Sequence, residues 1–169
     1  QWQFTFTPQV NDSYTLWINS VPRRSGREEF ALNLISSPDL QVERRPISLQ
    51  PTSTVVTPQI RGELHWMDDV RPKLNKSTNG TLRLLDSSGD PITDLQSYMG
   101  AFAHIVGIAE DMNSILHVHP EGAATSDTDH GGPEVRFSLR PTRQGFYRLF
   151  VQVMRHDEVL TLPFGLRVD

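Results

Sequence analysis

Three of the chain's six histidines, His104, His117 and His119, lie within a single stretch from Leu95 to Pro120. In this stretch two apolar runs, AFAHIVGIA and SILHVHP, flank the polar connector EDMN, a pattern that predicts a β-hairpin. Residues two apart in a strand share a face, so we expect His117 and His119 on one face of the hairpin. Imidazoles gathered in this way are typical of a site for a transition metal ion.

The length of the connector decides whether His104 joins the other two histidines. An even loop, either residues 111–112 or residues 110–113, pairs residues whose numbers sum to 223 and so places His104 opposite His119. An odd loop places His104 on the other face, because a shift of one residue reverses every side chain. The predicted metal site therefore depends on an even loop.

Three imidazoles suit copper or zinc and leave a fourth position for water, substrate or another side chain. Each imidazole must be neutral to bind, so binding is expected to weaken below about pH 6. The alternative is structural: His104 is packed and bonded to a backbone carbonyl, while His117 and His119 lie on an exposed face. We expect copper first and zinc second, with His104, His117 and His119 as the ligands.

Other residues near this stretch are weaker candidates. His130 lies in the polar segment EGAATSDTDHGG, where it would act as a fourth ligand or lid, although a crossover between sheets is the favoured interpretation. Met99 and Met154 would be thioether ligands for Cu(I), but methionine in a β protein usually fills space in the core.

The elements that position the histidines are predicted to be short strands separated by turn residues. Seven are expected, near residues 63–66, 80–85, 100–108, 114–119, 134–141, 145–154 and 159–168. No stretch carries a helical period with caps. This pattern predicts an all-β protein, with an immunoglobulin-like antiparallel β-sandwich over residues 58–169.

The C-terminal part of the chain also resembles a family of bacterial extracytoplasmic immunoglobulin-like domains with a GxxxH…LHVHP pattern, related to the secreted, heavy-metal-associated YtkA-like and FixH-like proteins. The residues that carry the resemblance are Asp94, Leu95, Tyr98, Gly100, His104, residues 116–120, Gly132, Pro133, Val135, Phe137, Gly145, Tyr147, Leu149, Gln152, Thr161, Pro163, Phe164 and Val168. Phe102 and Ala103 depart from the pattern and leave the histidines intact. The resemblance implies a sandwich fold, a metal role and a periplasmic or secreted location.

Composition excludes several classes of function. The net charge is −4 and basic residues form no stripe, so a nucleic acid partner is not expected. The absence of cysteine excludes disulfides and thiolate metal sites. No run approaches the ~20 apolar residues of a membrane helix. No nucleophile elbow, phosphate loop or zinc-protease motif occurs, so we do not expect an enzyme.

The beginning of the chain repeats part of its end. Without gaps, residues 2–21 align with residues 135–154, with Phe4 on Phe137, Pro8 on Pro141, Tyr14 on Tyr147 and Leu16 on Leu149. Such a repeat suggests duplication. We predict that residues 1–57 hold the last strands of a partial immunoglobulin-like unit, with residues 50–58 as a linker.

The first strands of that partial unit would lie upstream of Gln1. We therefore expect a fragment or a processed form of a longer protein. The missing part would anchor the protein to a membrane, and the remaining strands would pair with a protein partner or with a second copy of the chain. Two functions follow from the sequence. One is extracytoplasmic capture, buffering or delivery of a metal ion, and the other is a structural or protein-interaction module with structural histidines.

Overall fold

The computed structural model describes residues 3, 5–6, 14–20, 24, 29–35, 48–121, 126 and 128–169. The chain divides into two compact units, residues 1–47 and residues 48–169. Apart from one short 3₁₀ turn, η1 (Met67–Asp69), the regular elements of the described residues are β-strands, and each ladder between them is antiparallel. The predicted all-β antiparallel architecture is confirmed.

Among the described residues of the first unit, β1 (Tyr14–Ser20) and β2 (Glu29–Ile35) form a hairpin. Tyr14 lies opposite Ile35, and the ring of Phe6 packs edge-on against the ring of Tyr14 with 4.9 Å between centroids. The apolar run FALNLI at residues 30–35 predicts a strand, and β2 confirms it. The loose alternation of residues 40–49 predicts another strand, which falls largely outside the described residues.

The described residues of the second unit form ten strands. In chain order these are β3 (Thr54–Val56), β4 (Ile60–Trp66), β5 (Thr78–Asp86), β6 (Leu95–Gln96), β7 (His104–Ala109), β8 (Ile115–Pro120), β9 (His130–Gly131), β10 (Glu134–Leu139), β11 (Gly145–Arg155) and β12 (Glu158–Val168). The seven predicted strands correspond to β4, β5, β7, β8, β10, β11 and β12.

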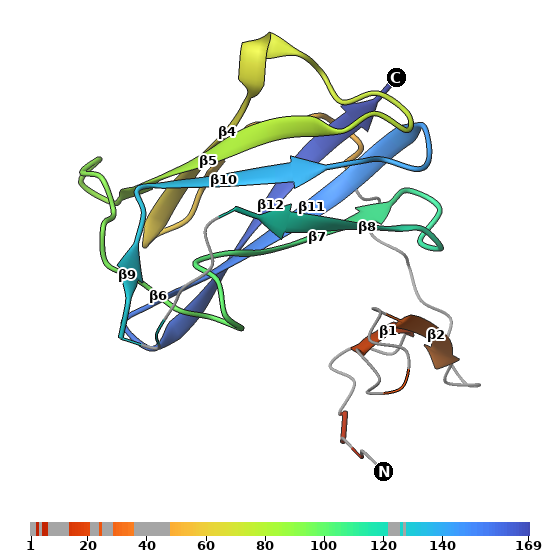
Figure 1. Ribbon diagram of the computed structural model, residues 1–169, viewed down its shortest axis with the longest axis horizontal. Helices are drawn as coiled ribbons and strands as arrows, with labels where there is room; N and C mark the ends of the chain where they lie inside the picture. The colour runs from red at the N-terminus through yellow and green to blue at the C-terminus, as the bar shows by residue number, and fades with distance from the viewer. Residues whose placement is uncertain are drawn as a thin grey trace. The chain divides into compact units, whose positions relative to one another are not determined.

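These strands form a sandwich of two layers (Figure 1). One layer has the order β3-β4-β5-β10, and the other places β7 between β8 and β11, with β12, β6 and β9 also in that layer. Strand β8 belongs to both layers. Residues 115–118 pair with β7, whereas His119 and Pro120 pair with Ser138 and Phe137 of β10.

The layers are also joined on the opposite side, by the segment before β4. Thr52 exchanges backbone hydrogen bonds of 2.9 and 3.0 Å with Gly165 of β12, and the next residues form β3 against β4. Gly165 has no room for a side chain, because a Cβ atom there would meet the carbonyl oxygen of Gln50 and the amide nitrogen of Thr52. The predicted linker at residues 50–58 is therefore wrong, since this segment is part of the sandwich.

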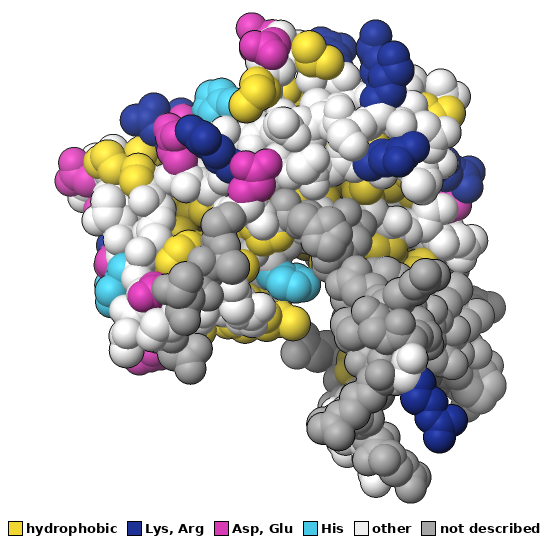
Figure 2. Space-filling model, viewed as in Figure 1, with side chains coloured by type: hydrophobic (Ala, Val, Ile, Leu, Met, Phe, Trp, Pro, Cys, Tyr) yellow, Lys and Arg dark blue, Asp and Glu magenta, His cyan; other side chains and the backbone are white. Residues whose placement is uncertain are grey.

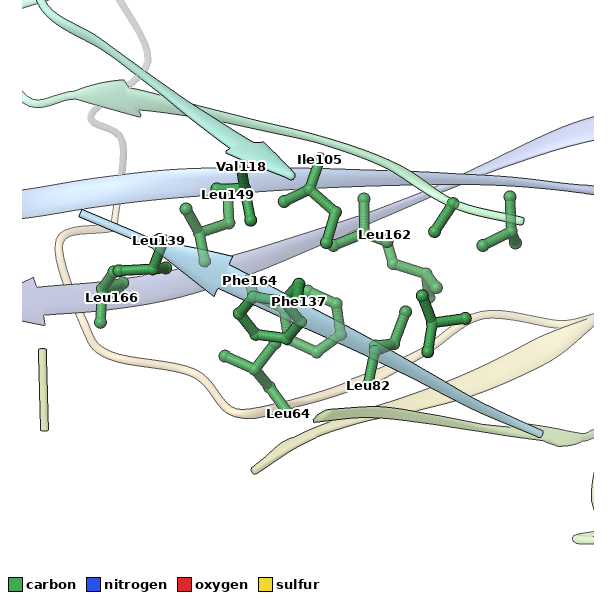
Figure 3. Close-up of a cluster of buried hydrophobic side chains, with 14 of the residues drawn as sticks. Leu64, Leu82, Ile105, Val118, Phe137, Leu139, Leu149, Leu162, Phe164 and Leu166 are labelled. Carbon is green, nitrogen blue, oxygen red and sulfur yellow. The ribbon is translucent and has the colours of Figure 1, made fainter. Parts of the chain in front are cut away.

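The core between the layers is built from alternate residues of the facing strands (Figure 3). Leu64, Leu82 and Phe137 project into it from one layer, and Leu149 and Phe164 project from the other. All five are at most 5% exposed. This burial of apolar side chains is the main stabilising contribution to such a fold.

Tyr147 marks the corner where the chain enters β11. Its side chain is 1% exposed, and its hydroxyl donates a hydrogen bond of 3.3 Å to the carbonyl oxygen of Arg143. Burial raises the pKa of the Tyr147 hydroxyl above its usual range. A tyrosine bonded to the backbone a few residues upstream is a feature of immunoglobulin-like sandwiches. The immunoglobulin-like topology itself stays a prediction.

Candidate metal centre

The β7–β8 hairpin has an even loop. The loop consists of four residues, Glu110–Asn113. It is closed by a hydrogen bond of 2.9 Å from the backbone amide of Ala109 to the carbonyl oxygen of Ser114. The pairs of the ladder run from Ile105 opposite Val118 to Ile108 opposite Ile115, so residue numbers sum to 223 in each pair. The predicted register is therefore confirmed.

Asp111 fixes this turn. Its carboxylate accepts hydrogen bonds from the amides of Asn113 and Ser114 at 3.1 and 3.2 Å and from the Ser114 hydroxyl at 3.2 Å. The guanidinium of Arg143 donates to it at 2.5 Å. Burial alone would raise the pKa of the Asp111 carboxyl, but these donors outweigh burial and hold the pKa below its usual range. The local sequence thus closes a four-residue loop rather than an odd one.

The hairpin has one face in the core and one face outside, which we call the outer face. Ile105 and Val118 are buried and lie opposite one another, whereas His104 is half-buried and alternates with them. His117 lies opposite Val106 of the outer face. Strand alternation therefore assigns the positions of His104, His117 and His119 to the outer face. The side chains of His117 and His119 lie outside the described residues.

The register brings these positions close together. His104 is diagonal to His117 across the ladder, a relation that corresponds to about 7–8 Å between Cα atoms. The ladder ends at the pair Ile105–Val118, and His104 and His119 are the next residue on each strand. His119 is also the residue at which β8 begins to pair with β10. This change of partner could not be predicted from the local sequence.

The neighbouring strand β11 supplies the other side of the site. Gln152 lies opposite His104, and Phe150 lies opposite Val106. In the sequence, Gln152 is marked only as a residue of the family pattern. Its position beside His104 follows from the β7–β11 register, which joins segments far apart in the chain and leaves no local signal.

Two other histidines and Met99 lie away from this face. His65, with a 62% exposed side chain, lies on β4 in the other layer, 3.8 Å from Glu63. His156 lies in the β11–β12 turn, 3.2 Å from a carboxylate oxygen of Asp94. Met99 is 70% exposed at a turn, so it does not fill the core as predicted. Among the described side chains, no three histidine, aspartate or glutamate residues are grouped to hold a metal ion.

Asp94 and the residues of the β11–β12 turn form a charged cluster. A hydrogen bond of 2.8 Å from Arg155 holds the pKa of the Asp94 carboxyl below its usual range. Gln96 donates to Asp157 at 2.8 Å and accepts from the Asp157 amide at 2.7 Å. These contacts attach β6 to the turn and so fix where β6 lies along β11.

The surface of the other layer carries mixed charge. Figure 2 shows Lys and Arg side chains interspersed with Asp and Glu side chains over the face of β4, β5 and β10. Glu63 and Glu134 lie on either side of Arg83, and Arg61 forms a 2.6 Å ion pair with Glu63. Because the charges alternate, this face lacks the continuous positive charge that attracts a nucleic acid.

The described part of the chain also contains no helix with the length and apolar composition to cross a membrane.

Comparison with known proteins identifies a family without an assigned activity. The profile of the family described as "Domain of unknown function (DUF8832)" matches residues 60–169, and the chain therefore belongs to that family. The crystal structure of the S-layer protein SbsC domains 4 and 5 is similar at 10% identity and a TM-score of 0.36, covering 96% of this chain and 67% of that chain. A TM-score of 0.36 does not show that the two proteins share a fold. No curated protein matches the chain.

Proposed function

We propose that this member of the DUF8832 family binds a copper or zinc ion through His104, His117 and His119. The observation that carries the proposal is the register of the β7–β8 hairpin, in which the pairs sum to 223. That register assigns all three histidine positions to the outer face. Sites with three imidazoles suit copper and zinc, and copper is the first choice because affinity for nitrogen ligands peaks there.

The proposed role is capture, buffering or delivery of the metal outside the cytoplasm, in the periplasm or as a secreted protein. The resemblance to extracytoplasmic immunoglobulin-like domains supports the location. The lack of cysteine is consistent with it, because stability then needs no controlled disulfide pairing. The proposed role is binding without catalysis. The proposal also includes an immunoglobulin-like topology for the sandwich.

Titration with Cu(II) and Zn(II) tests the proposal. The full chain is compared with a His117→Ala/His119→Ala variant and with His65→Ala, which removes an exposed imidazole from the other layer. We expect tight, one-to-one binding by the wild type and by His65→Ala. The double variant should bind at least about tenfold more weakly, because two ligands are lost.

Equal and weak uptake by all three proteins would contradict metal binding through this site. The interaction-module function would then remain, with the histidines as structural residues. Circular dichroism of each variant separates lost binding from lost folding. The outer-face location of the substituted residues leads us to expect folded variants.

A further inference from the structure

We infer that His130 is a fourth ligand of the same metal site, an inference that rests on the proposed function. His130 is ten residues beyond Pro120 in the chain and forms the short strand β9 with Gly131. The strand register brings it back to the outer face beside the other histidines.

Strands β7 and β6 lie one after the other along the same edge of β11. His104 at the beginning of β7 is opposite Gln152, and Gln96 of β6 is opposite Met154. Gln152 and Met154 are two apart in one strand and share a face. His104 and Gln96 are therefore successive positions of the outer face. Figure 1 shows β6 and β9 beyond the end of the layer at which β7 begins.

Strand β9 continues this arrangement by one more strand. Gln96 lies opposite His130, and the adjacent pair is Leu95 opposite Gly131. Leu95 is fully buried, so the Leu95–Gly131 pair faces the core and the Gln96–His130 pair faces outward. The close approach of the Phe102 ring to Gly131 agrees with this, because Phe102 packs against the core cluster.

Together, the pairings give one contiguous set of four histidine positions. Beside β7 the next strand holds His117 and His119, and beside β6 the next strand holds His130. His104 is diagonal to His117 across the β7–β8 ladder. His130 faces Gln96, which is the next outer-face position beside His104 along the edge of β11. The side chain of His130 is exposed, so an ion has access to it from solvent.

A fourth imidazole changes what the site can do. Four protein ligands saturate a zinc ion, and sites of this kind hold the metal without an open position for a substrate. Four nitrogens also suit the tetragonal geometry of Cu(II). The inference therefore assigns the site to holding and handing over a metal ion rather than to catalysis on it.

The test uses the full chain loaded with Cu(II) or Zn(II), with His130→Ala compared with the control His65→Ala. Nitrogen couplings in the Cu(II) electron paramagnetic resonance spectrum report the number of imidazoles. We expect four in the wild type and in His65→Ala and three in His130→Ala. Affinity should fall at least about tenfold in His130→Ala, the lower limit known for losing even outer-shell support.

Added azide gives an independent readout of the fourth position. Azide should leave the Cu(II) spectrum of the wild type unchanged and shift that of His130→Ala, because the substitution opens a coordination position. Tight binding that needs His117 and His119 but is equal in His130→Ala and His65→Ala would overturn this inference and leave the proposed function in place. Wild-type binding no tighter than that of His117→Ala/His119→Ala would overturn both.

Discussion

At the scale of single residues, Asp111 determines where the histidines lie. Its carboxylate bonds the amides that close the four-residue loop, and the loop length sets the β7–β8 register. The donors around it lower the pKa of the carboxyl. A carboxyl whose pKa is lower in the folded chain than in the unfolded chain stabilises the fold above its unfolded pKa and loses this effect as the pH falls.

Substituting Asp111→Asn should lower the free energy of unfolding by about 1–2 kcal/mol at pH 7, since a charged acceptor of several hydrogen bonds is replaced by a neutral one. The difference from wild type should begin to shrink as the pH falls below about 4, the pKa of an unfolded aspartate, and should vanish only below the lower pKa of the folded carboxyl. Urea unfolding at pH 7 and pH 3 measures both effects. Asp90→Asn, at another exposed turn, is the control and should change stability by less than about 0.5 kcal/mol. An equal loss at both pH values would mean that the charge of Asp111 is not the cause.

Some features of the candidate site can be predicted from single residues and others cannot. The EDMN connector predicts where the loop lies, because its polar residues stand between two apolar runs, but it leaves open whether the loop has an even or an odd number of residues. The partner of His104 on β11, and the return of His130 through β9, depend on pairings between distant segments. The forces that bring Gln152 and His130 to this face are tertiary, so no short-range pattern marks them.

At the scale of elements, strand length decides which strands are predictable. The long strands β11 and β12 alternate over 11 residues each, which is enough to reveal their period. Strands β3, β6 and β9 have 3, 2 and 2 residues and carry no period of their own. The segment before β4 was predicted as a linker because it is rich in proline and threonine. It forms β3 because β4 and β12 have backbone groups to pair with it.

Gly165 is the position at which this segment is most sensitive to change. In Gly165→Ala the new methyl group would lie 3.0 Å from the amide nitrogen of Thr52 and closer still to the carbonyl oxygen of Gln50. We expect a loss of about 1–3 kcal/mol, the usual cost of overpacking. Chemical denaturation measures the loss, and hydrogen exchange of the Thr52 amide should become faster. Thr161→Val, an exposed change on the same strand, should leave both unchanged, and an unaffected Thr52 amide in Gly165→Ala would contradict the role of this contact.

At the scale of the whole molecule, the structure places the boundary between the units at residues 47 and 48 rather than near residue 57. The difference matters because residues 48–57 include β3 and the pairing with β12. The hairpin of the first unit also matches the last hairpin of the second. Tyr14 lies opposite Ile35, and its repeat partner Tyr147 lies opposite Leu166. The predicted duplication is consistent with this pairing and stays a prediction.

Two truncated chains test the boundary. Residues 48–169 should fold with the thermal midpoint of the second unit in the full chain, whereas residues 58–169 should unfold at a lower temperature. The shorter chain loses the partly buried Val55 and the backbone bonds of Thr52, a loss of about 2 kcal/mol or more. Differential scanning calorimetry of both chains gives the midpoints. Equal midpoints would show that residues 48–57 do not stabilise the sandwich.

The pairing of Thr52 with Gly165 also determines how the second unit responds to tension. The two segments run antiparallel, so the chain before Thr52 and the chain after Gly165 leave in the same direction along the sheet. A force that pulls the two segments apart would therefore break their hydrogen bonds one after another. It would not load all of these bonds at once, as a shear force would. The second unit should therefore yield first at this seam under a stretching force, while the core beneath it is still closed.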